Sequence, residues 1–157
     1  HGNALLSRWP VLQHRHEDMS DHRLEQRGLL HVTLHIQERE VHVIVIHLGL
    51  LPGSRIRQTQ QLHDFIEREV PADAPLLVAG DFNDWGNAVA KMMATVGLHT
   101  DEGRPHPTYP SRLPLVQLDH VYARGVHRVA THVPRGPIWG RMSDHLPLLV
   151  EFAWDAS

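Results

Sequence analysis

The sequence predicts a single α+β domain in which strands outnumber helices. About six or seven segments carry the alternating or continuous apolar pattern of strands, whereas two carry apolar residues near helical spacing. The chain of 157 residues is long enough for one hydrophobic core and shows neither an internal repeat nor a linker. Its composition, 41% hydrophobic and 21% charged, is that of an ordinary globular protein. One domain is therefore expected over residues 1–157.

The first third of the chain predicts strands. Gly2–Ser7 is short and apolar and is followed by Arg-Trp-Pro, which predicts a strand that ends at the proline. His14–Gln26 is charged and aperiodic, which predicts an exposed loop or a solvated edge. Leu29–Ile36 and Val41–Leu48 restore the period-two apolar pattern and predict a hairpin. Their connection, Gln37–Glu40, lacks the Asn-Gly pair that would define the turn type, so the register stays open.

The rest of the chain predicts two helices and four strands. Ile56–Val70 has apolar residues near helical spacing and ends at a proline, which predicts a surface helix. Leu76–Ala79 is a compact apolar strand, and Asn87–Val96 predicts a helix that ends at a glycine. Gly103–Pro114 holds four prolines among polar residues and predicts an ordered surface loop. Three further strands are expected at Val116–Tyr122, Val126–Val133 and Leu146–Phe152.

Charge, cysteine content and hydropathy exclude several classes of protein. The formal net charge of -3 with neutral histidines argues against a protein that coats nucleic acid through bulk positive charge. The absence of cysteine excludes disulfides and thiolate metal sites. No apolar run approaches the ~18 residues that a membrane-spanning helix needs. No targeting segment is legible, so a soluble chain is expected, with the cytoplasm as default location.

Polar residues that can carry chemistry follow the apolar strands. Asp81 and Asn83 stand two residues apart after the strand Leu76–Ala79, so both side chains can face one side. His47 lies at the end of another apolar strand. Each has a simpler interpretation, because Gly-Asp-Phe-Asn-Asp is also a turn composition and a single histidine at a strand end is often a satisfied core residue.

Three further candidates lie in the C-terminal half. Asp144 and His145 precede the last strand and join a carboxylate that suits Mg²⁺ or Mn²⁺ to an imidazole that can donate to a phosphoryl oxygen. A polar loop that caps the strand is the alternative. Asp119 lies within an apolar strand, where an unpaired charge is costly. Its expected partner is His145, whose tautomer and charge it would fix, and a salt bridge to an arginine is the alternative.

Several arginines fall in predicted loops or at element ends. They could rim a polyanion site or be solvated surface charges. Trp139 could stack on a base or a lipid headgroup, or pin its loop to the core. The arginines are Arg55, Arg57, Arg104, Arg112, Arg135 and Arg141.

In their order along the chain, four motifs resemble those of the endonuclease/exonuclease/phosphatase family. The motifs are strand-His47, Gly80-Asp81-Phe82-Asn83, Leu118-Asp119-His120-Val121 and Ser143-Asp144-His145-Leu146-Pro147. The segments Gly2–Arg8 and Thr108–Pro110 are also similar to family segments, so the resemblance spans nearly the whole chain. It is strongest to small bacterial members without an assigned substrate.

The resemblance implies a fold and a reaction. The fold would be a four-layered α/β sandwich of the DNase I-like type, with two mainly antiparallel sheets face to face and helices outside. The reaction would be hydrolysis of a phosphodiester or phosphomonoester, dependent on Mg²⁺ or Mn²⁺, by in-line attack of an activated water. Such a site must neutralise the ester oxygens and deprotonate water in one place.

The resemblance also implies a role for each matching residue. Asp81 would activate the attacking water, and Asn83 would orient that water or the phosphate. Asp119 would hold His145 against the phosphoryl oxygens, which His47 would contact as a donor or as the acid for the leaving group. The implied metal ligands are Asp144, Asp81 and Asn83.

The family pattern also includes an asparagine and a glutamate on strands before the position of Gly2, and this sequence contains neither. The chain is therefore expected to be an N-terminally incomplete domain that could self-associate through uncovered sheet edges. A non-catalytic domain that binds phosphate or nucleic acid is the alternative function. Nucleic acid, inositol phosphate and lipid headgroup are not distinguished as substrates.

A histidine-rich zinc-binding protein is a third interpretation. His31 and His35 have the spacing His-x3-His. In a predicted strand, however, they would lie about 13 Å apart at roughly 3.3 Å per residue, which is too far for one ion. We therefore disfavour this interpretation.

Overall fold

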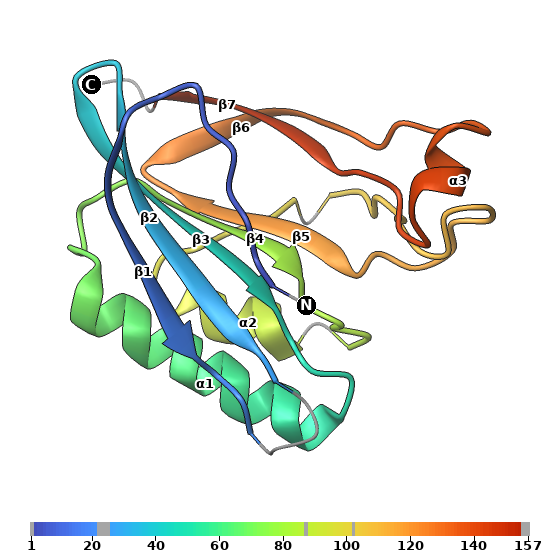
Figure 1. Cartoon of the computed structure of the whole chain (residues 1–157), viewed down its shortest axis with the longest axis horizontal. Coiled ribbons are helices and arrows are strands. Elements are labelled where there is room, and N and C mark those ends of the chain that lie inside the picture. The colour runs from blue at the N-terminus through green and yellow to red at the C-terminus, as the bar shows by residue number, and fades with distance from the viewer. Residues whose placement is uncertain (1, 22–25, 87, 102, 155–157) are drawn as a thin grey trace.

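The computed structural model describes residues 2–21, 26–86, 88–101 and 103–154. Within these residues a five-stranded sheet has the order β1-β2-β3-β4-β5, and a two-stranded sheet pairs β6 with β7 (Figure 1). The strands are β1 (Val11–Asp18), β2 (Gly28–Ile36), β3 (Arg39–His47), β4 (Leu76–Asp81), β5 (Asp119–Arg124), β6 (Val126–His132) and β7 (Leu149–Trp154). The helices are α1 (Pro52–Glu69), α2 (Ala88–Ala94) and α3 (Trp139–Met142).

The directions of the central strands bring three chain segments to one edge of the sheet. β1, β2 and β3 are successive antiparallel neighbours, β4 runs parallel to β3, and β5 runs antiparallel to β4. The helix α1 is therefore the crossover between the two parallel strands. Because β5 opposes β4, its first residue lies beside the last residue of β4, which in turn lies beside the last residue of β3.

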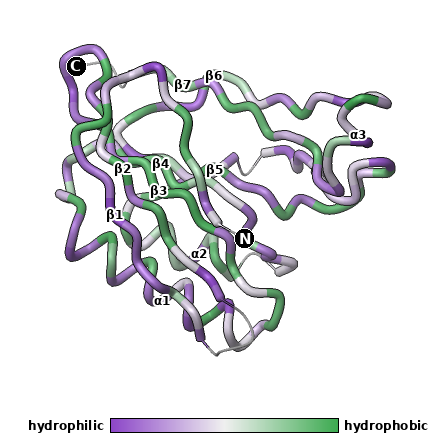
Figure 2. The backbone as a smooth tube through the Cα atoms, in the orientation of Figure 1, coloured by the Kyte–Doolittle hydropathy of each residue, from purple (hydrophilic) through white to green (hydrophobic). Residues whose placement is uncertain are grey.

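The larger core lies between the five-stranded sheet and the helices α1 and α2, which cover the same face (Figure 1). Side chains alternate between the two faces of a strand, and Ile44 of β3 and Val78 of β4 point toward the helices. Leu62 and Phe65 of α1 and Met93 of α2 pack against them. The tube in Figure 2 shows that the central strands are the hydrophobic part of the sheet.

The opposite face of the sheet packs against the N-terminal segment and the two-stranded sheet. The buried side chains there belong to β2 and β3, and Leu5 and Trp154 pack against them. The Trp154 Nε1–H donates to Gln37 Oε1 at 2.6 Å, which fixes the end of β7 over the β2–β3 turn. The chain thus has an α+β fold with two sheets and helices outside. The buried residues of this second cluster are Leu30, Val32, Leu34, Val41 and Val43.

The prediction of a strand at Gly2–Ser7 is wrong. This segment is in no sheet and crosses the face of β2 and β3, where Asn3 Nδ2 donates to Gly28 O at 2.6 Å and to Val45 O at 3.1 Å. Its apolar residues cover the sheet instead of extending it. For His14–Gln26, the solvated edge is confirmed as far as the end of β1, whose mostly exposed residues explain the missing apolar alternation. Residues 22–25 lie outside the described residues.

The other predicted elements are present with shifted ends. β5 and β7 each begin three residues later than predicted, and Asn87, the expected first residue of the second helix, lies outside the described residues. The single turn α3 was not predicted. The hairpin turn is closed by Gln37 and Glu38, whose φ angles of 48° and 66° give the geometry that Asn-Gly usually provides. Among the described helices, none is both long and apolar enough to cross a membrane.

Two histidines are buried together under α1. His31 Nε2 lies 2.9 Å from His42 Nδ1, and the His31 ring packs edge-on against Phe65. Burial disfavours the charged imidazole and, with the nearby His42, lowers the pKa of His31 to about 4. Burial also lowers the pKa of His42. The pair is therefore neutral in the folded chain near pH 7.

We expect the free energy of unfolding to fall as the pH is lowered from about 6.5 to 4. The unfolded histidine binds a proton near pH 6.5, whereas folded His31 stays neutral until about 4, so acid favours the unfolded state in this window. At about 1.4 kcal/mol per pKa unit, His31 accounts for about 3 kcal/mol. Urea unfolding at stepped pH, compared between wild type and His31→Gln, measures the contribution. The exposed His35 on the same strand gives the control His35→Gln, which should keep the wild-type pH dependence. Equal pH dependence in all three proteins would contradict the expectation.

Candidate active site

Three polar side chains meet where β3 and β4 end and β5 begins. His47 is the register partner of Asp81, and Asp81 is the register partner of Asp119. Neighbouring strands are about 4.8 Å apart, so the backbone alone places the three side chains in one row. The Leu48 N–H donates to Asp81 O at 2.9 Å and continues the pairing past the end of β3.

Two backbone features aim Asp81 at this edge. Gly80 has φ +153°, and a Cβ there would lie 1.8 Å from Ile46 O, so only glycine permits β3 and β4 to approach this closely. Asn83 has φ 48° and its backbone N–H donates to Asp81 Oδ1 at 2.9 Å. The Asn83 Nδ2 donates to Leu48 O at 2.9 Å. Asn83 therefore fixes the loop after β4 through its backbone and side-chain nitrogens, and no hydrogen bond among the described residues uses its Oδ1.

His145 reaches Asp119 from the loop before β7. His145 Nδ1 lies 2.7 Å from Asp119 Oδ2, and Thr108 Oγ1 donates to the same oxygen at 2.5 Å. The carboxylate can only accept a hydrogen bond, so Nδ1 carries a proton. Nε2, at the opposite edge of the ring, faces away from Asp119. The ring packs on Tyr109 with centroids 4.9 Å apart. Among the described residues, the ion-pair partner of Asp119 is thus His145 and not an arginine.

Backbone contacts hold the loop that carries Asp144 and His145. Ser111 N–H donates to Asp144 O at 2.7 Å, and Ser111 Oγ donates to Ser143 O at 2.7 Å. The Asp144 carboxylate itself is exposed, with Ser143 Oγ 3.4 Å from its Oδ1. The loop therefore brings His145 to the centre and leaves the Asp144 carboxylate on the surface.

Asp81 Oδ2 lies between two imidazoles. It is 3.5 Å from His47 Nε2 and 3.7 Å from His145 Nε2. One ligand atom each from Asp81, Asp119 and His145 lies within 4.8 Å of the others, and all three residues are half-buried. The centre is a small cluster of two carboxylates and two imidazoles that is partly removed from water.

Burial and mutual contacts shift the pKa values of this cluster in different directions. Burial raises the pKa of Asp81, and the Asn83 N–H only partly opposes that effect. Burial and the positive charge of Arg27 lower the pKa of His47. For His145, burial acts downward, but its hydrogen bond to Asp119 and the surrounding carboxylates prevail and raise the pKa. His145 is thus the imidazole that keeps its proton most readily, and Asp81 is a more basic carboxylate than usual.

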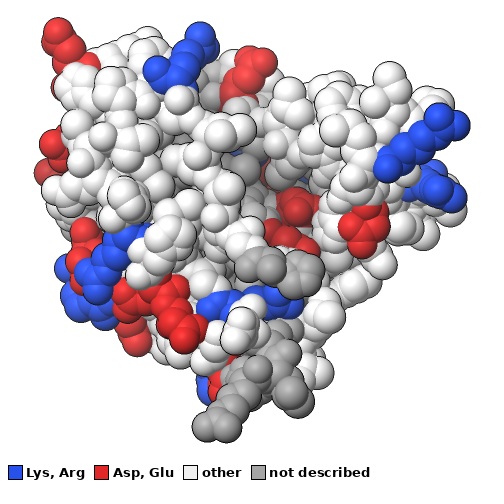
Figure 3. Space-filling model, viewed as in Figure 1, with Lys and Arg blue, Asp and Glu red and all other residues white. Residues whose placement is uncertain are grey.

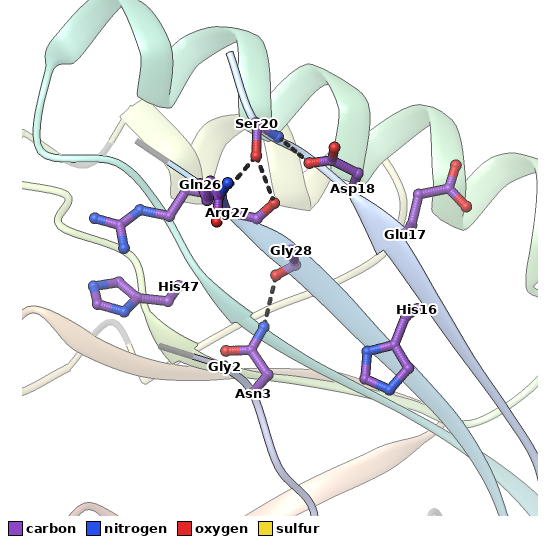
Figure 4. A pocket seen from close by; sticks show the side chains of 10 residues that line it. All are labelled: Gly2, Asn3, His16, Glu17, Asp18, Ser20, Gln26, Arg27, Gly28 and His47. Carbon is purple, nitrogen blue, oxygen red and sulfur yellow. Dashed lines mark hydrogen bonds between the residues drawn. The ribbon is translucent and has the colours of Figure 1, made fainter. Parts of the chain in front are cut away.

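A groove adjoins the cluster on the side of His47 (Figure 4). It has a volume of about 990 Å³ and is lined by residues from the N-terminal segment, the end of β1 and the start of β2. Asn3 and Arg27 line it, and the Arg27 guanidinium lies on the same side as the His47 ring. Sequence reasoning missed both Arg27 and Thr108 as site residues. Thr108 stood in a segment noted only for its family likeness, and a single arginine before a strand gives no signal.

The residues fit a hard divalent cation of the Mg²⁺ type. Such an ion is held by one or two carboxylates and completes its shell with water and substrate oxygens. Asp81 Oδ2 accepts no hydrogen bond from the described residues, whereas the Asp144 carboxylate is exposed and lies outside the group of Asp81, Asp119 and His145 whose ligand atoms are within 4.8 Å of one another. Asp119 Oδ2 already accepts from His145 and Thr108, so Asp119 orients the imidazole instead of offering a ligand.

The chain matches a protein family and a bacterial relative over most of its length. Residues 1–145 match the model of the endonuclease/exonuclease/phosphatase family. The uncharacterized protein YbhP of Escherichia coli K12 is 35% identical over 158 residues, which cover 96% of this chain and 62% of that protein. The chain thus spans somewhat less than two thirds of that relative's length.

Solved structures share the fold at low sequence identity. A conserved protein of unknown function from Enterococcus faecalis has a TM-score of 0.78 at 21% identity, and the match covers 93% of this chain and 67% of that one. The mannosyl-6-phosphatase of Bacteroides thetaiotaomicron has the same TM-score and coverage at 13% identity. The order of the motifs, their meeting where β3, β4 and β5 lie side by side, and the family match all agree. The chain therefore belongs to the endonuclease/exonuclease/phosphatase family.

Proposed function

We propose that this chain carries the catalytic residues of a phosphoesterase that hydrolyses a phosphodiester or phosphomonoester by in-line attack of water. The observation that carries the proposal is Asp81 Oδ2 between His47 Nε2 and His145 Nε2, at 3.5 and 3.7 Å. A carboxylate between two nitrogen donors can accept a proton from water while the donors contact the oxygens of an anionic ester. The mannosyl-6-phosphatase of similar fold supports phosphoester chemistry on this architecture.

Each residue of the cluster has one task in this proposal. The water oxygen attacks phosphorus, its proton passes to Asp81, and the bond from phosphorus to the leaving oxygen breaks. His145 donates from Nε2 to a phosphoryl oxygen as the imidazolium, which the hydrogen bond from its Nδ1 to Asp119 and the neighbouring carboxylates favour by raising its pKa. His47 donates to the same phosphate or protonates the leaving oxygen. Asn83 keeps Asp81 in place through the 2.9 Å bond from its backbone N–H, and its Oδ1 is free to orient the water.

Asp81 and Asp144, with Asn83 Oδ1, would hold a divalent cation. When bound, the ion would supply positive charge that neutralises the phosphoryl oxygens and lowers the pKa of water. Mg²⁺ and Mn²⁺ both prefer such oxygen ligands.

We expect hydrolysis of a generic activated phosphodiester to need Mg²⁺ or Mn²⁺ and to stop in EDTA. Restoring an excess of the ion should restore the rate. In Asp144→Ala the ion concentration that gives half of the maximal rate should rise at least about tenfold, which corresponds to about 1.4 kcal/mol of ion binding.

The control for Asp144→Ala is Glu151→Ala, which removes an exposed carboxylate from β7 and should leave the ion dependence unchanged. Equal rates in EDTA and in Mg²⁺ would reject a metal-assisted reaction. A correctly folded chain that binds phosphate but hydrolyses no ester with either ion would favour the non-catalytic alternative.

A further inference from the structure

Two segments beside the site form one projection, which we call the site lobe and define as residues 110–116 and 134–144. It stands at the right of Figure 1 and includes α3. The two segments are joined by the hydrogen bonds from Ser111 to Asp144 O and Ser143 O, each 2.7 Å long. His145 directly follows the second segment, and its ring packs against Tyr109, which directly precedes the first segment. The lobe is therefore built onto the same contacts that position the catalytic imidazole.

The outer part of the site lobe exposes large aliphatic side chains. They come from both segments and lie within the described residues. Each is about two thirds exposed or more, although burial is the usual state for such residues. These side chains are Leu113 at 65%, Leu115 at 69%, Ile138 at 73% and Met142 at 70%.

The two segments of the lobe also carry three arginines. Arg112, Arg135 and Arg141 are all exposed, and no ion pair among the described residues involves them. The only acidic residue of the lobe is Asp144, at its base. Figure 3 shows basic side chains on the outer part of this projection and acidic ones in the adjacent hollow. The outer part is thus apolar and cationic, whereas the reaction centre beside it is acidic.

We propose that the site lobe docks the chain on an anionic lipid surface and that the phosphoester substrate is a lipid headgroup presented there. Aliphatic side chains that enter the boundary between headgroups and acyl chains, with arginines at the headgroup level, are the chemistry that such a surface recognises. This inference rests on the proposed phosphoesterase function and names its substrate class.

The exposed side chains favour lipid over nucleic acid. Single-stranded nucleic acid is held by aromatic rings on which bases stack, together with cations. The lobe has one aromatic ring, Trp139, and it is half-buried, whereas its most exposed apolar groups are aliphatic. Aliphatic tips gain little from a base but gain from entering an apolar layer.

Docking through the lobe would also determine how the reaction centre lies relative to the membrane. His145 follows Asp144 directly, so a membrane that contacts the lobe would lie on the part of the molecule from which the chain enters the cluster of Asp81, Asp119 and His145. The groove lined by Arg27 and His47 adjoins the same cluster. An ester in a headgroup could then reach the centre without leaving the lipid surface.

Vesicle co-sedimentation in EDTA tests the docking without any need for hydrolysis. The chain should bind vesicles of phosphatidylcholine mixed with phosphatidylglycerol and should bind pure phosphatidylcholine much more weakly. Leu113→Gln with Ile138→Gln should weaken binding roughly tenfold or more. Arg112→Gln with Arg135→Gln should weaken binding to the anionic vesicles alone, by roughly fivefold for each arginine.

Ile56→Gln is the matched control, because Ile56 is 57% exposed on α1, away from the lobe. It should bind vesicles as wild type does, and all variants should melt at the wild-type temperature. Equal binding to both kinds of vesicle, or wild-type binding by the Leu113/Ile138 variant, would overturn the proposal. Binding of a single-stranded oligonucleotide in preference to vesicles would overturn it in favour of nucleic acid. Asp81→Asn should keep vesicle binding, so failure of docking and failure of catalysis are distinguishable.

Discussion

Asp81→Asn is expected to lower the hydrolysis rate by about 10² to 10⁴-fold, the usual contribution of a positioned general base. The amide has the shape of the carboxylate and can still accept from the Asn83 N–H, so the loop after β4 should stay in place. The asparagine amide, however, cannot take a proton from water at the position between His47 and His145. Initial rates at saturating Mg²⁺ measure the loss of catalysis, and the melting temperature of the variant shows whether the fold is intact.

Stability should not fall in Asp81→Asn. Burial raises the pKa of Asp81, which means that the fold disfavours its charge, so a neutral replacement costs nothing in that respect. Asp73→Asn serves as the control, since Asp73 is exposed and lies before β4. If a folded Asp81→Asn protein kept more than about a tenth of the wild-type rate, Asp81 would not be the base that the proposal requires.

Gly80→Ala is expected to destabilise the chain by about 4 kcal/mol or more. The new Cβ would lie 1.8 Å from Ile46 O and 2.8 Å from Ile46 C, at a φ of +153° that alanine rarely adopts. The neighbouring atoms are backbone, so β3 and β4 must separate to accommodate the methyl group. For a chain of this size the melting temperature should fall by roughly 10 °C or more.

The control for Gly80→Ala is Gly86→Ala, where an added Cβ meets nothing within 4 Å. In thermal or urea unfolding, the stability of Gly86→Ala should be close to that of the wild type. A Gly80→Ala protein that melts with the control would show that the two parallel strands can separate at little cost. A stable but inactive Gly80→Ala protein would instead mean that the substitution disturbs the alignment of His47 with Asp81 and not the stability of the fold.

Local patterns in the sequence were enough to locate most elements. Apolar alternation predicted the β2–β3 hairpin, and helical spacing predicted α1, because both patterns report burial of one face of an element. The pattern failed for Gly2–Ser7, whose apolar residues cover a sheet without joining it. It also gave no definite strand for β1, since an edge strand has few buried residues to alternate.

Residue types and their order along the chain were sufficient to identify the family and to propose candidate site residues, because the motifs are local and ordered. Which side chains meet depends instead on how the chain folds. Asp119 and His145 are 26 positions apart, and their contact depends on the loop held by Ser111. The parallel pairing of β3 and β4 places His47 opposite Asp81, while the same fold leaves the Asp144 carboxylate exposed. Contacts of this kind join distant segments through strand pairing and loop closure, and a periodicity that reports only local burial carries no information about them.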